Sequence, residues 1–154
     1  MELLIKIAPG IITALLGSYF AARWSMKKFY SEKWWDRKEH AYSEIIDALY
    51  DVIQYCEIKK EDYGQGTGYP YEKESEFSSN YTAAFWKIKR VTDVGAFVIS
   101  AEAQNVLKDL RERPKLNWED NPSWDIYEED YEAHLKALNK IVELAKKDLG
   151  AKNV

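Results

Sequence analysis

An apolar run near the N-terminus passes directly into a basic, tryptophan-rich segment. Residues 7–22 contain no charged side chain, whereas residues 23–38 contain six Lys or Arg against two acids, a net charge of +4. A helix that crosses a bilayer needs roughly 20 apolar residues. Residues 3–5 complete that length if the Lys6 ammonium reaches the lipid headgroups. The pattern therefore predicts a membrane-spanning helix at the start of the chain.

Three segments follow from this pattern: a transmembrane helix at 1–24, a basic aromatic juxtamembrane collar at 25–40, and a helical domain at 41–154. One alternative, a secretory signal peptide, has its cations before the apolar core, whereas here they follow it. The other alternative is a buried core helix, but the collar's Trp and Tyr residues favour an interfacial aromatic belt. Because Lys and Arg mark the cytoplasmic side, we expect a single-pass inner-membrane protein with its N-terminus outside and its C-terminal domain in the cytoplasm.

Beyond the collar the chain is acidic. Residues 39–154 have 15 cations and 23 acids, a net charge of −8. DNA and RNA binding depend on cations that neutralise phosphates, so we expect no binding to DNA or long RNA. The single cysteine, Cys56, excludes an intramolecular disulfide, and its place in an apolar helical pattern indicates a small core residue.

Hydrophobic spacing predicts an all-α fold, in which the N-terminal transmembrane helix continues into a cytoplasmic antiparallel helical bundle. No Pro occurs between Ile11 and Asp62, and no Gly follows Gly17 there, so one long helix is expected. The residues 64–70 form a loop by composition, and their GxGxG string lacks the strand and helix context of a phosphate-binding loop. The expected inward face of the long helix consists of Tyr42, Ile45, Ile46, Leu49, Val52, Ile53 and Cys56.

Three further helices are expected. The second begins after Ser78–Asn80, and the third runs from the N-cap Ser100 to about Arg113. The fourth starts at Ser123 and ends before Gly150, with acids in its first turns and lysines in its last, as the helix dipole favours. The segment Phe97–Ile99 is a possible short strand. The apolar stripe of the fourth helix is expected to be Tyr127, Tyr131, Leu135, Leu138, Ile141, Val142, Ala145 and Leu149.

The sequence offers no motif for catalysis. His40 and His134 stand in no metal-ligand spacing, and His134 is expected on a solvated acidic helix face. We therefore expect no enzymatic activity, no metal and no cofactor.

Two patterns suggest binding. The first is a stripe of small residues with the GxxxA spacing that lets membrane helices approach each other, which favours a homo-oligomer. It consists of Gly10, Ala14, Gly17 and Ala21, with Ser18 beside it.

The second pattern combines cations with aromatic rings inside the acidic domain, as phosphate-linked bases require. The alternative is that these long side chains only cover the surface of the bundle. The candidate ligand-binding residues are Tyr81, Trp86, Lys87, Lys89, Arg90, Arg111 and Arg113, with Phe85, Lys115 and Trp118 nearby.

The order of one membrane span, then Glu32–Trp35, Ala41–Ile46 and the closing Leu144–Gly150, resembles a widespread group of small bacterial membrane-anchored helical proteins. In size and layout the chain is also similar to the membrane-anchored effectors of type III CRISPR systems. That resemblance implies a tetrameric cytoplasmic helical domain that binds cyclic tetra-adenylate. It assigns no binding residue, because no nucleotide motif matches.

Two hypotheses follow. In the first, the chain is an oligomeric, membrane-anchored effector of bacterial antiviral defence, which binds a cyclic oligoadenylate between subunits and perturbs the membrane through its long helix. In the second, it is a constitutive membrane-tethered scaffold that recruits a protein partner through its acidic helical domain.

Overall fold

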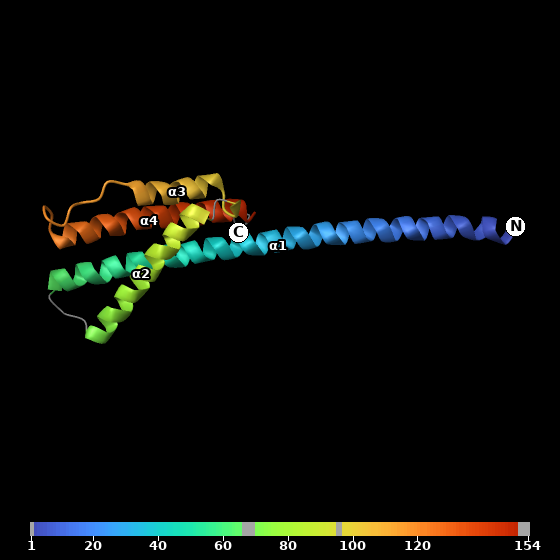
Figure 1. Cartoon of the computed structure of the whole chain (residues 1–154). Coiled ribbons are helices and arrows are strands. Elements are labelled where there is room, and N and C mark those ends of the chain that lie inside the picture. The colour runs from blue at the N-terminus through green and yellow to red at the C-terminus, as the bar shows by residue number, and fades with distance from the viewer. Residues whose placement is uncertain (1, 66–69, 95–96, 151–154) are drawn as a thin grey trace. The chain divides into compact units, whose positions relative to one another are not determined.

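The computed structural model describes the backbone of residues 2–65, 70–94 and 97–150, and the side chains of residues 17–63, 70, 72–93 and 97–150. Within these ranges the regular structure consists of four helices: α1 (Glu2–Gln65), α2 (Tyr71–Val94), α3 (Ala101–Glu112) and α4 (Ser123–Asp148) (Figure 1). The predicted all-α class is confirmed. The possible strand at Phe97–Ile99 was wrong, because these described residues form a short turn that leads into α3.

The chain divides into two compact units, residues 1–37 and residues 38–154. The first unit consists of the N-terminal part of α1, and all of its described side chains, residues 17–37, are exposed. In the described part of the chain, no helical stretch has both the length and the apolar character that crossing a membrane requires. The transmembrane segment expected at 1–24 falls largely on residues 1–16, whose side chains lie outside the described set.

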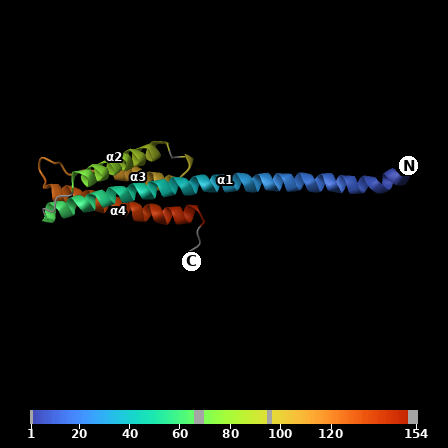
Figure 2. The same ribbon diagram turned by 90° about the horizontal axis from the view of Figure 1, so that it is seen from below.

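In the second unit, the C-terminal half of α1 and the other three helices alternate in direction. Views along two axes show α4 beside this half of α1, with α2 crossing α1, and α3 packs against α4 and α2 (Figures 1 and 2). Contacts near both ends establish the antiparallel order: Tyr42 with Asp148, Lys60 with Glu128, Glu44 with Lys87, Lys59 with Glu74, Glu102 with Lys147, and Arg113 with Asp130. This arrangement is a four-helix bundle with up-down-up-down topology.

The core draws on all four helices. Every predicted inward residue of α1 except Ile46 is buried, and Ile46 packs against the core while half-buried. Cys56 is fully buried, as expected, and burial raises the pKa of its thiol to about 12. The buried hydrophobic cluster consists of Tyr42, Ile45, Ala48, Leu49, Val52, Cys56, Ala84, Ile88, Ile99, Ala103, Leu107, Leu110, Ala137, Ile141, Leu144 and Ala145.

The ends of α3 and α4 agree with the sequence prediction. The Ser100 hydroxyl accepts a hydrogen bond from the Ala103 amide, which satisfies one of the amides that a helix N-terminus leaves unpaired. Pro122 precedes α4, and its carbonyl accepts from Ile126. At the other end Gly150 has φ of +68°, a left-handed conformation that favours glycine after a helix.

The predicted start of α2 was wrong. The helix begins at Tyr71, and the Pro70 carbonyl accepts hydrogen bonds from Lys73 and Glu74. The Ser78–Asn80 cluster lies inside the helix. Glutamates in the first turn of α2 interact favourably with the positive end of the helix dipole. In addition, the ring of Tyr81 on α2 packs against α1, and this packing outweighs the weak helix propensity of the Ser78–Asn80 cluster.

The predicted inward stripe of α4 was also partly wrong. Its buried residues are Ile126, His134, Ala137, Ile141, Leu144 and Ala145. Tyr127, Tyr131 and Leu138 are only half-buried against the core. The large rings of the predicted stripe therefore lie at the edges of the buried face, and aliphatic residues together with His134 occupy its centre.

Candidate functional site

A small cleft opens where α2, α3 and the loop after α3 meet, and we call it the cationic cleft. Its cavity has a volume of about 80 Å³. It brings together four of the seven candidate ligand-binding residues. Tyr81 and Lys89 come from α2, and Arg111 and Arg113 come from the end of α3 and the loop that follows it. The lining residues are Tyr81, Phe85, Ile88, Lys89, Leu110, Arg111, Arg113, Lys115 and His134.

Two of the cleft's four cations already pair with carboxylates. One Arg111 guanidinium nitrogen lies 2.5 Å from Asp93 and another lies 3.6 Å from Glu112. Arg113 pairs with Asp130 and lies 3.7 Å from Glu129. The pair made by Arg111 is largely exposed to water, whereas the side chain of Arg113 is only 15% exposed.

Arg113 is anchored further by the backbone. Its guanidinium donates to the Leu110 carbonyl at 2.6 Å, an acceptor that the end of α3 would otherwise leave unpaired. Breaking a buried ion pair leaves an uncompensated charge, which costs more than the pair itself contributes. Arg113 therefore holds the α3 terminus against α4, and a structural role accounts for its contacts.

The other two cations, Lys89 and Lys115, pair with no carboxylate in the described part of the chain. Instead, their ammonium groups lie near aromatic rings. The Nζ of Lys89 is 4.8 Å from the ring centroid of Trp86, and that of Lys115 is 5.9 Å from the centroid of Phe85. Such cation–π contacts orient an ammonium without neutralising it.

The base of the cleft includes His134, which the sequence had placed on a solvated face; that interpretation was wrong. Its side chain is buried, and its Nδ1 lies 2.6 Å from the Asp130 carbonyl oxygen. Burial, with the positive charges of Arg113 and Lys115, lowers the pKa of His134 below its ordinary value, although Asp130 acts against this. A neutral imidazole is therefore favoured at the bottom of the cleft.

Three candidate residues do not line the cationic cleft. Lys87 pairs with Glu44 at 3.4 Å, and Trp86 is more than half exposed beside Lys89. Arg90 is exposed on α2 and makes no ion pair within the described ranges. Sequence reasoning missed the apolar floor formed by Ile88 and Leu110, because nothing in the spacing showed that α2 and α3 meet there.

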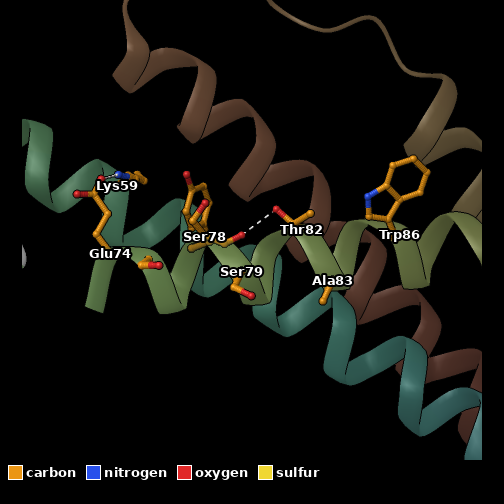
Figure 3. Close-up of a pocket in the computed structure, with 9 residues that line it drawn as sticks. Lys59, Glu74, Ser78, Ser79, Thr82, Ala83 and Trp86 are labelled. Carbon is orange, nitrogen blue, oxygen red and sulfur yellow. Dashed lines mark hydrogen bonds and ion pairs between the residues drawn. The ribbon is translucent and has the colours of Figure 1, made fainter. Parts of the chain in front are cut away.

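A second, wider depression lies between α1 and α2, with a volume of about 730 Å³. Figure 3 shows its hydroxyl-bearing side chains along α2, with the Lys59–Glu74 ion pair at one end and Trp86 at the other. The Thr82 hydroxyl donates to the Ser78 carbonyl, so that part of this polar surface is satisfied by its own helix. The charged residues that line this groove, Lys59 and Glu74, pair with each other.

Tyr81 belongs to the wall between the two depressions. Its ring stacks on Tyr55 with centroids 4.4 Å apart, and burial, followed by nearby negative charge, raises the pKa of its hydroxyl to about 12. The Tyr81 ring therefore helps to attach α2 to α1, and one edge borders the cationic cleft.

No group of His, Cys, Asp or Glu in the described part of the chain has the arrangement of a metal site. The small-residue stripe is described only at Gly17 and Ala21, since Gly10 and Ala14 lie outside the described side chains. A Cβ built at Gly17 meets nothing within 4 Å. The helix surface at Gly17 is therefore open in the single chain.

The chain matches no protein-family model, no curated protein and no solved structure.

Proposed function

We propose that this chain is a membrane-anchored, non-enzymatic helical protein, with residues 1–24 in the inner membrane and the domain 41–154 in the cytoplasm. The supporting observation is that all described side chains in residues 17–37 are exposed. This stretch includes large rings that a chain in water would be expected to cover. Trp24 is 81% exposed and Tyr30 64% exposed.

Lipid is the surface that suits this composition. Aromatic rings prefer the headgroup region, where an apolar body and a polar edge are both accommodated. The six cations of residues 23–38 are attracted to the anionic lipids of a cytoplasmic leaflet, by about 1 kcal/mol for each charge near the surface. The same helix would then place the first of its rings in the interfacial layer and carry its cations from that layer into the cytoplasm.

Fractionation and topology reporters test the anchor. We expect the full chain to sediment with membranes and to resist extraction by high salt, because the apolar segment remains in the bilayer. A C-terminal reporter should be active only when it functions in the cytoplasm. A chain found in the supernatant at physiological salt, or a reporter active only on the periplasmic side, would contradict the proposal.

For the bundle, the cationic cleft favours an effector that binds a phosphate-bearing ligand, such as a cyclic oligonucleotide, in bacterial antiviral defence. Cations from α2, α3 and the following loop gather in one place in a domain that is otherwise acidic. In an oligomer each cation would be repeated by symmetry, which matches a cyclic ligand with one phosphate per nucleotide. Calorimetric titration of the full chain in detergent with cyclic oligoadenylates tests this, and no heat at tens of micromolar would reject that ligand.

The alternative is a constitutive membrane-tethered scaffold that recruits a protein partner through the acidic bundle. The internal pairing of Lys87, Arg111 and Arg113 favours it, since paired cations are less available to a ligand. A protein partner that binds equally well to the Lys89→Gln variant, together with no binding of any nucleotide, would favour the scaffold.

A further inference from the structure

We propose that the cationic cleft is a binding site for a phosphate monoester, which Lys89 of α2 and Lys115 of the loop after α3 hold, with Arg111 as a third contact. The inference rests on the effector function proposed above for the choice of site, and it takes the phosphate-bearing ligand to be a monoester, which a cyclic oligonucleotide does not contain, so that the two titrations test different ligands. The ligand class follows from the charge, size and pairing of the cleft itself.

Charge comes first. The four carboxylates beside the cleft all lie against its two arginines: Asp93 and Glu112 pair with Arg111, and Asp130 and Glu129 pair with Arg113. Together these carboxylates offset the four cations of the cleft, but the ammonium groups of Lys89 and Lys115 have no carboxylate partner in the described part of the chain. A phosphate monoester has a charge of about −1.5 to −2 at neutral pH and three acceptor oxygens. It can therefore accept hydrogen bonds from both of these unpaired ammonium groups.

Size comes second. An engineered cavity of about 150 Å³ binds benzene, whereas the cationic cleft has about 80 Å³. This space suits a phosphate group better than a nucleobase. The group bonded to the phosphate would then lie toward the exposed ring of Phe85, which is 41% exposed at the rim.

The two arginines differ in their availability. Arg111 is 35% exposed and its partner Asp93 is 50% exposed, so the pair is of the surface kind that contributes little to stability. Guanidinium binds phosphate through two parallel hydrogen bonds, so a ligand can replace Asp93. Arg113 stays with Asp130, because both side chains are at least four-fifths buried.

Adenosine monophosphate is a suitable probe, with adenosine as the control that lacks the phosphate. Calorimetric titration of the full chain in detergent micelles should show binding of the monophosphate alone. Each of the variants Lys89→Gln and Lys115→Gln should weaken it about tenfold, the loss of one charge-assisted hydrogen bond. The matched control is Lys87→Gln, which removes the same charge from the same helix but outside the cleft and should leave the affinity unchanged.

Asp93→Asn gives the sharper test. It releases Arg111 from its carboxylate and should tighten binding several-fold, an effect that a purely structural role would not produce. Short-chain phosphatidic acid, titrated in parallel, distinguishes a lipid headgroup from a soluble ligand as the source of the monoester.

Equal weakening by Lys87→Gln and Lys89→Gln would overturn the proposal, because net charge alone would then explain binding. Absence of binding by both monoesters at millimolar concentration would overturn it as well. Neither result bears on the membrane anchor, which fractionation tests separately.

Discussion

The Tyr42 hydroxyl donates a hydrogen bond to the Asp148 carboxylate and thereby joins α1 to the last turn of α4. The same hydroxyl lies 3.2 Å from the Ser100 hydroxyl and accepts from the Ser100 amide at 3.3 Å. One phenol, 1% exposed, therefore connects α1, the N-cap of α3 and the end of α4. Hydrogen bonds to a charged group contribute more than neutral ones.

Replacing Tyr42 with Phe should destabilise the bundle by about 1 to 2 kcal/mol, at the lower part of the range for charged hydrogen bonds because Asp148 retains contact with water. Chemical denaturation followed by circular dichroism measures this loss. Tyr50→Phe is the matched control, since Tyr50 lies on the same helix and is 57% exposed. Equal stability of the two variants would show that the contact with Asp148 contributes nothing.

Arg113→Gln should destabilise the bundle by roughly 2 to 4 kcal/mol, because it leaves Asp130 without its partner in a largely buried position. The exposed pair between Lys147 and Glu102 provides the comparison: Lys147→Gln should cost no more than about 1 kcal/mol. Thermal unfolding of the two variants distinguishes the two kinds of pair. A change at Arg113 as small as that at Lys147 would favour a ligand role over the structural role assigned above.

The stability of the bundle should fall as the pH falls below about 6.5, the ordinary value for histidine. Burial first, and then Arg113 and Lys115, lower the pKa of His134 in the fold, while Asp130 acts in the opposite direction. Between the lowered pKa and the ordinary one, the unfolded chain binds a proton that the folded chain does not. Acid therefore favours unfolding in that pH window. The contribution of the neutral His134 to stability is fully present at pH values above the ordinary pKa of histidine.

Unfolding free energies measured from pH 7.5 to 5 check this expectation. His134→Gln should flatten the slope across this window, whereas the exposed His40→Gln should retain it. An unchanged slope in His134→Gln would assign the pH dependence to other groups.

A second pH effect belongs to Asp148. Burial raises the pKa of its carboxyl, but the hydrogen bonds from Tyr42 and Ser100 outweigh burial and hold the pKa below its ordinary value. The folded chain releases this proton more readily than the unfolded chain does. The contribution of the Asp148 carboxylate to stability is therefore present above the ordinary pKa of about 4 and is lost as the pH falls through the lowered value. Tyr42→Phe should therefore reduce the acid sensitivity below pH 4, and denaturation at pH 3 and pH 5 measures the difference.

Gly17→Ile should weaken self-association in membranes, because a branched side chain keeps neighbouring helices apart. A Cβ at this position meets nothing within 4 Å in the single chain, so the substitution does not disturb the fold itself. Chemical crosslinking in membranes measures the effect. The control Ala22→Ile lies off the small-residue stripe, and equal crosslinking of the two variants would mean that this stripe does not form the contact.

Much of the helical order could be predicted from local chemistry. The hydroxyl of Ser100 and the ring of Pro122 define helix starts whatever the rest of the chain does, since capping and proline geometry act within one turn. The inward face of α1 was equally accessible, because Tyr42, Leu49 and Cys56 repeat with the period of a helix. These interactions are short-range, so the sequence by itself was sufficient.

The remainder depended on contacts between distant segments. The start of α2 differs from the prediction because a cluster of weak helix formers is held in the helix by neighbours such as Tyr55, which stacks on Tyr81. His134 is buried because α2, α3 and the loop after α3 pack around this part of α4, and periodicity on a single helix does not specify that packing. Lys89 and Lys115 line the same cleft, whereas Lys87, two residues before Lys89 on α2, pairs with Glu44. The antiparallel packing of four helices decides which of the chain's cations are paired and which remain free, because only packing brings residues distant in sequence within a few ångströms of each other.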